Sequence, residues 1–189
     1  MGAPEFSEAN LYDAVISMLG QMRQAAGRKG IVLISSGIDT FSEAGFDDVL
    51  QTARTSDTPI YVISLVPMLR QIVQMQAPTE PLARVDWQKA EKQLEEIARL
   101  SGGRAYAPES TIDLSATYDD LLENLKIRYV VSYRSSSNSD LNSPRTIRIE
   151  LVDPKTGGPL HVIDTNGRTI PAMVVVQNSY VPSTALPGK

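Results

Sequence analysis

Two short, uninterrupted apolar runs constrain the fold of this chain more than any other feature. They are residues 30–37 (GIVLISSG) and 58–66 (TPIYVISLV). Strands that are apolar at consecutive positions, rather than at every second one, are typical of a parallel sheet with both faces covered. Stretches with helical spacing of apolar residues come before, between and after the two runs. The sequence therefore predicts an α/β fold, in which right-handed helical crossovers connect parallel strands.

Amphipathic periodicity predicts helices around these strands. The expected ranges are Leu11–Ala26, Asp47–Thr55, Asp86–Ser101 and Asp113–Lys126, with a short strand at 104–107 before the last helix. The segment Pro67–Val85 has no clear period and is interrupted by Pro67, Pro78 and Pro81. We expect it to form a long loop with at most one helical turn, around Leu69–Gln74.

The sequence changes character after Ile127. Strands are expected at 129–133, 147–151, 160–163 and 172–176, with a polar loop at 135–143 and an Asn166–Gly167 hairpin turn between the last two strands. The predicted organisation is a cloning remnant or disordered start (1–10), an α/β domain (11–134), a β-hairpin tail (135–182) and a disordered end (183–189).

Composition and charge argue against several classes of protein. The 189 residues carry a formal net charge of −4, which gives the chain no electrostatic reason to bind nucleic acid. Cysteine is absent, so zinc–thiolate sites and cysteine nucleophiles are excluded. No apolar run approaches the roughly 20 residues that a membrane span needs.

Sites for catalysis are equally scarce in the sequence. His161 is the single histidine, and neither a Gly-x-Ser-x-Gly nucleophile motif nor a Gly-rich phosphate loop occurs. We interpret His161 as a structural or surface residue, and Asp47 and Asp48 as carboxylates that open a helix. We therefore expect no catalytic residue and no cofactor. The alternative is an α/β enzyme or nucleotide-binding domain on a similar sheet.

An ordered set of motifs resembles a known family. These are LYDAV at 11–15, GRKGIVLISSGIDT at 27–40, PIYVISL at 59–65, SGGRAY at 101–106 and YVVSY at 129–133. Together they resemble the C-terminal half of bacterial von Willebrand factor type A-related domains. The resemblance implies part of a three-layer, Rossmann-like parallel sheet, followed here by an antiparallel β-rich C-terminal tail.

The resemblance also implies where a metal site would lie. Many members of that family hold Mg²⁺ with an Asp-x-Ser-x-Ser loop, a threonine from a second loop and an aspartate in a Ser-Asp-Gly turn. This chain has no Asp-x-Ser-x-Ser motif, Ala9 stands at the threonine position, and Ser36 replaces the aspartate. We expect a degenerate site near Ser35, Ser36 and Asp39 that binds no Mg²⁺.

Two segments are candidate partner-binding sites. Ser36, Asp39 and Thr40 follow a buried strand, where ligands of open α/β sheets bind; the competing interpretation is that these side chains bond their own loop and cap the next helix. Met68, Leu69 and Met75 form a soft apolar segment that either contacts a partner or packs over the core.

The strand Ile31–Ser35 has no expected neighbour on one side, because the resemblance covers only half of a sheet. An apolar edge without a charge or proline invites pairing with another chain. We expect a non-catalytic protein-binding or scaffold module of a bacterial secreted or envelope protein, with a protein partner or homo-oligomerisation through this edge.

Overall fold

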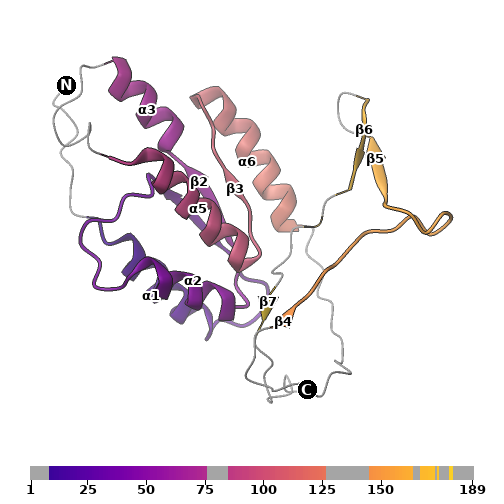
Figure 1. The fold of residues 1–189 in the computed structure, drawn as a ribbon, viewed down its shortest axis with the longest axis horizontal. Coiled ribbons are helices and arrows are strands. Elements are labelled where there is room, and N and C mark those ends of the chain that lie inside the picture. Colours follow the sequence, from indigo (N-terminus) through magenta and orange to yellow (C-terminus); the bar gives the residue numbers. More distant parts are fainter. Residues whose placement is uncertain are drawn as a thin grey trace.

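A computed structural model describes residues 9–75, 85–126, 145–163, 167–172, 174 and 179–180. The fold is mixed α/β, with a three-stranded parallel sheet and two separate two-stranded antiparallel sheets (Figure 1). The predicted α/β class is therefore confirmed. The predicted strand 129–133, the polar loop 135–143 and the chain end 183–189 lie outside the described residues.

The parallel sheet has the order β1-β2-β3, made from Ile31–Ser35, Ile60–Ser64 and Ala105–Tyr106. Ile31 lies opposite Ile60 and Ser35 opposite Ser64, so β1 and β2 pair along their whole length. Only Val62 and Ile63 of β2 pair with β3. Among the described residues, β1 and β3 are thus the two edges of this sheet, and β2 is its centre.

Three helices cover one face of the sheet: α1 (Leu11–Met22), α2 (Phe46–Thr55) and α5 (Trp87–Ser101). In Figure 1 they lie on one side of the strands, while α6 lies on the other side. Their inward stripes form the larger core, which includes Leu19, Val49, Leu94 and Ile97 together with Ile60 and Val62 of β2. Each of these side chains is at most 1% exposed, so this face is fully closed over β2.

Among the described residues, one helix, α6 (Thr111–Lys126), covers part of the opposite face. Leu121, with Leu114 and Leu125 beside it, packs on Tyr61 and Ile63 of β2 and on Tyr106 of β3. Helical spacing places Tyr118 on one face with Leu114, Leu121, Leu122 and Leu125 and predicts that it faces inward, but it is 57% exposed. The cover that α6 provides is therefore incomplete.

The predicted burial of the two apolar strands is correct for β2 and wrong for β1. Every residue of β2 is buried, whereas β1 alternates between half-buried and exposed residues. Val32 and Ile34 lie opposite Tyr61 and Ile63, on the face that α6 covers, yet they are 44% and 60% exposed. The physical reason is that α6 packs over β2 and β3 and leaves β1 bare.

The turn from α5 into β3 contacts the start of β2 closely. Gly102 ends the helix in the left-handed conformation (φ 79°), as the sequence predicts for a glycine at this place. The Ser101 hydroxyl accepts the Ile60 N–H at 2.9 Å and donates to the Ala98 carbonyl at 2.9 Å. A side chain at Gly103 would overlap the Ile60 carbonyl oxygen, which explains why the residue after Gly102 is also glycine.

The segment after β2 is helical, contrary to the expected long loop. Helix α3 spans Val66–Met75, and Pro67 lies in its first turn, where a missing N–H costs no hydrogen bond. The prolines further on, Pro78 and Pro81, lie outside the described residues. The three prolines in the segment suggested a loop, although only Pro67 lies within the helix.

The tail forms small antiparallel pairs. β5 (His161–Ile163) pairs with β6 (Thr169–Pro171), and β4 (Arg145–Thr146) pairs with β7 (Ser179–Tyr180). The second strand of the hairpin thus lies at 169–171, while most of the predicted strand 172–176 lies outside the described residues. The predicted strand 147–151 is replaced by β4 and an isolated bridge between Val152 and Pro159.

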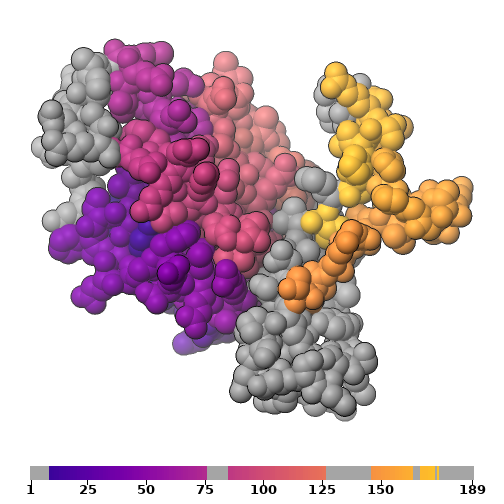
Figure 2. Space-filling model, viewed as in Figure 1, coloured from indigo at the N-terminus to yellow at the C-terminus, as the bar shows by residue number. Residues whose placement is uncertain are grey.

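The tail hairpin has no interior of its own. All residues of β5 and β6 are exposed, including Val162, Ile163 and Ile170. Figure 2 shows the hairpin standing away from the α/β part of the molecule. A two-stranded hairpin is marginally stable alone, so the fold is held by the α/β part.

Candidate functional site

The loop after β1 bonds the beginning of α1. The Asp39 carboxylate accepts the Tyr12 N–H at 3.1 Å and the Ser42 hydroxyl at 2.6 Å. Ser42 Oγ in turn accepts the N–H groups of Tyr12 (3.1 Å) and Asp13 (3.2 Å). The first turn of a helix has N–H groups without helical partners, and Asn10, at the N-cap position, makes no side-chain cap. Asp39 and Ser42 therefore cap α1 from the loop.

Further contacts tie the same loop to α1. Thr40 Oγ1 accepts the Ala9 N–H at 3.0 Å, and the Thr40 N–H donates to the Ala9 carbonyl at 3.0 Å. In the other direction, the Asp13 carboxylate accepts the N–H groups of Glu43 (2.9 Å) and Ala44 (3.0 Å). The loop side chains cap the helix that precedes β1, whereas the sequence suggested capping of the following helix.

The two serines at the end of β1 bond their own turn. Ser35 Oγ accepts the Gly37 N–H at 3.0 Å, and Ser36 Oγ accepts the Ile38 N–H at 3.5 Å. Both serines are half-buried. In the parts of the chain that the structure describes, no group of three or more His, Asp or Glu side chains is placed to hold a metal ion.

The structure places Met68, Leu69 and Met75 on α3. Met68 and Leu69 are half-buried, while Met75 is 81% exposed and Ile72, one turn earlier, is 45% exposed. Gln71 Nε2 donates to the Glu109 carbonyl at 3.1 Å, which ties α3 to the segment before α6. The Met-rich segment is thus a helix with an exposed apolar end, and it is separate from the loop of Asp39.

The remaining polar candidates make local contacts of their own. Asp48 accepts the Gly45 N–H at 2.8 Å at the beginning of α2. His161 is exposed in the tail hairpin, and its Nδ1 lies 2.9 Å from the Pro159 carbonyl oxygen. Within the described ranges, no helix is both long enough and apolar enough to cross a bilayer.

In the part of the chain that the structure describes, no strand pairs with the outer edge of β1, which lies beside exposed apolar side chains. The Ile31 N–H donates to the Pro59 carbonyl, and the Leu65 N–H donates to the Ser35 carbonyl, each at 2.9 Å. Residues alternate in direction along a parallel strand, so the N–H and C=O groups of Val32 and Ile34 point away from β2. The edge predicted from the sequence therefore combines main-chain hydrogen-bonding groups with an exposed apolar face.

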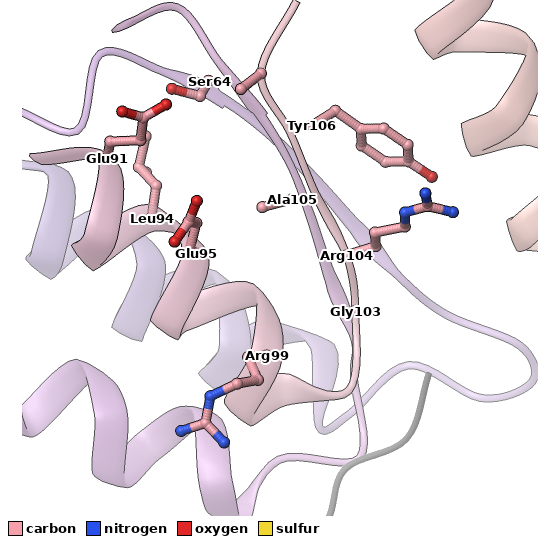
Figure 3. Close-up of a pocket in the computed structure, with 10 residues that line it drawn as sticks. Ser64, Glu91, Leu94, Glu95, Arg99, Gly103, Arg104, Ala105 and Tyr106 are labelled. Atoms are coloured by element: carbon pink, nitrogen blue, oxygen red, sulfur yellow. The ribbon is translucent and has the colours of Figure 1, made fainter. Parts of the chain in front are cut away.

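A groove of about 340 Å³ lies between α5 and β3. Its walls include Glu91, Glu95, Leu94, Ala105 and Ala107. Figure 3 shows Glu91 and Glu95 on the α5 side, while Arg104 and Tyr106 point to the far side of β3. The sequence reasoning missed this groove, although the alternation of alanine with a larger residue at 105–107 was a visible signal of a strand with space on one face.

Electrostatics differ between the two sides of β3. Arg104 lies 5.2 Å from the centre of the Tyr106 ring and pairs with Asp120 at 3.1 Å. Burial, and then the neighbouring Asp120 carboxylate, raise the pKa of Tyr106 to about 12. On the groove side, Arg99 pairs with Glu96 at 2.6 Å, and the pair lowers the pKa of Glu96. Arg99 beside the groove and Arg104 on the far side of β3 are thus both paired with carboxylates.

No family model matches this chain, and no curated protein or solved structure does either.

Proposed function

We propose that this chain is a non-catalytic protein-binding or scaffold module that binds through the outer edge of β1. The observation that carries the proposal is the exposure of Val32 and Ile34, at 44% and 60%, on a strand whose outer edge has no partner strand among the described residues. Soluble proteins usually protect such an edge with a charge, a proline or a covering element. The strand Ile31–Ser35 contains neither a charge nor a proline.

The family resemblance belongs to this proposal. The parallel order β1-β2-β3, with helices on both faces, supports a three-layer, partial von Willebrand factor A-like domain. In this reading Ser36 stands where the family has a metal-binding aspartate, and its hydroxyl bonds the Ile38 N–H. The proposed module therefore binds without Mg²⁺ and belongs to a secreted or envelope protein, as the bacterial subgroup that it resembles implies.

The proposed occupant of the edge is a second copy of this chain. Two copies of β1 can pair antiparallel about Leu33, with Val32 of each opposite Ile34 of the other. The outward N–H and C=O groups of both residues would then be paired, because they form the hydrogen-bonded positions of that register. Each Val–Ile pair also buries apolar area that is exposed in the single copy.

Sedimentation equilibrium over a wide concentration range tests the proposal. We expect the native chain to dimerise and the double variant Val32→Lys/Ile34→Lys to weaken the dimer about 30-fold. This magnitude corresponds to two lost cross-strand pairs of up to about 1 kcal/mol each. EDTA should leave the dimer unchanged, because the contact uses only backbone and apolar groups.

The matched control is Ile72→Lys/Met75→Lys, which adds the same charge to exposed residues of α3. It should not change the dissociation constant. A native chain that stays monomeric at every concentration would refute self-pairing. If the α3 variant weakened the dimer equally, the contact between the two copies would not be at β1.

A further inference from the structure

The second edge of the sheet, β3, forms one wall of the groove beside α5. Val62 lies opposite Ala105, and the Val62 N–H donates to the Arg104 carbonyl at 2.8 Å. In a parallel ladder, a residue bonds the neighbours of the residue opposite it, so the N–H and C=O of Ala105 point away from β2. The groove therefore has main-chain hydrogen-bonding groups along one side.

Small side chains keep this groove open. Ala105 and Ala107 present only methyl groups, and the floor is completed by Leu94, which is 1% exposed. Ser64 lies at one end and is 3% exposed; its hydroxyl accepts the Val66 N–H at 3.3 Å. In Figure 3 the Ser64 hydroxyl lies on the same side as the Glu91 carboxylate.

The groove has a negative rim. Glu91 and Glu95 are four residues apart on α5 and therefore share one face of the helix. Among the described residues neither makes an ion pair, while Arg99 and Arg104 are paired with Glu96 and Asp120. The charge that remains for a ligand is thus that of two carboxylates.

We propose that this groove binds an extended basic peptide, which adds to the outer edge of β3 as a further strand. The spacing of the carboxylates selects the pattern of basic residues. Four helical residues rise about 6 Å, and alternate residues of a strand are about 6.6 Å apart. Lysine or arginine at alternate positions would therefore reach Glu91 and Glu95 together. This surface is distinct from the edge of β1 and does not depend on self-association.

The test uses a labelled, capped peptide, Thr-Lys-Val-Lys-Val-Thr, in fluorescence anisotropy. The peptide should bind saturably, and Glu91→Gln/Glu95→Gln should weaken binding about tenfold at low salt. Glu43→Gln/Asp119→Asn removes the same charge at exposed residues outside the groove and should leave the affinity unchanged. Thermal melting checks that both double variants are folded.

Two further probes test the mode of binding. A peptide with N-methyl groups on the amides that would pair with Ala105 should lose binding, and a peptide with glutamate in place of lysine should not bind. The amide NMR signals of Ala105 and Ala107 should shift when the parent peptide binds. Each of three results would overturn the proposal. These are NMR shifts at Val32 and Ile34 instead, an N-methylated peptide that binds as well as its parent, and unchanged affinity in Glu91→Gln/Glu95→Gln.

Discussion

Removing the carboxylate of Asp39 measures whether the loop after β1 is structural. Asp39→Ala deletes the acceptor of the Tyr12 N–H and of the Ser42 hydroxyl, at 3.1 and 2.6 Å. Hydrogen bonds to a charged group contribute about 1.5–3 kcal/mol each when they are well buried. Asp39 is half-buried, and Ser42 Oγ also accepts the Tyr12 N–H, so the sum is smaller. We expect a loss of about 2 kcal/mol, at the upper end for a helix cap.

Two other substitutions distinguish the contribution of the capping hydrogen bonds from that of the carboxylate charge alone. Asp39→Asn keeps one oxygen acceptor but loses the charge near the helix N-terminus, and should cost about 1 kcal/mol. Asp47→Asn removes a carboxylate from the first turn of α2 and should cost at most about 0.5 kcal/mol. Urea unfolding followed by circular dichroism gives the three values. Hydrogen exchange at the Tyr12 and Asp13 amides should accelerate in Asp39→Ala.

The expected order is Asp39→Ala, then Asp39→Asn, then Asp47→Asn. If Asp39→Ala unfolds at the same urea concentration as Asp47→Asn, the hydrogen bonds to α1 do not stabilise the fold. The loop would then have to be reconsidered as a ligand site, and the structural interpretation of Asp39 would be wrong.

Two more predictions concern β3 and its turn. Gly103→Ala should destabilise the fold by about 3 kcal/mol in urea unfolding, because its Cβ would lie 2.5 Å from the Ile60 carbonyl carbon. The comparison is Gly20→Ala in α1, where an added Cβ would have nothing within 4 Å. This substitution should instead stabilise α1 by roughly 0.5–1 kcal/mol. Burial and Asp120 raise the pKa of Tyr106 to about 12, so the folded state holds this proton more tightly than the unfolded state. The stability that this provides is complete below pH ~10 and is lost as the pH rises through about 12. Tyr106→Phe should remove a component that titrates near pH 12 from the phenolate absorbance; an unchanged titration curve would contradict the assigned environment.

The sequence predicted the elements whose signals are local. Aspartate at 86 and glycine at 102 are typical cap residues and predict the two ends of helix α5; the Asp86 carboxylate accepts the Lys89 N–H at 2.9 Å, and Gly102 is the C-cap. Helical spacing predicts one stripe of Trp87, Ala90, Leu94 and Ile97; the last three are buried, whereas Trp87 is only half-buried. Capping residues and helical spacing act within a few residues, so one sequence suffices to recognise them.

Other features depend on contacts between distant segments. The apolar runs of β1 and β2 look alike, and only the position of α6 decides that Val32 and Ile34 are exposed. The bond from Tyr12 to Asp39 spans 27 residues, so the loop could be recognised as polar but not as a cap for α1. The groove beside β3 likewise requires α5 and β3 to be placed together. The sequence shows the chemical type of every residue, but it does not show which residues become neighbours in the fold.

The contact of Ser101 and Gly103 with Ile60 has a mechanical consequence. It anchors the carboxyl end of α5 to the first residue of β2, so α5 cannot slide along the sheet as a rigid rod. Any tilt of α5 must pivot at this anchor, and displacement grows along the helix from Arg99 toward Glu91. The space beside β3 would then widen as a wedge, narrow near Gly103 and wide near Ser64. Bulky groups of a bound chain would be admitted only at the Ser64 end of the groove. The two ends of the groove would then differ in what they accept, which would not be so if the helix slid freely.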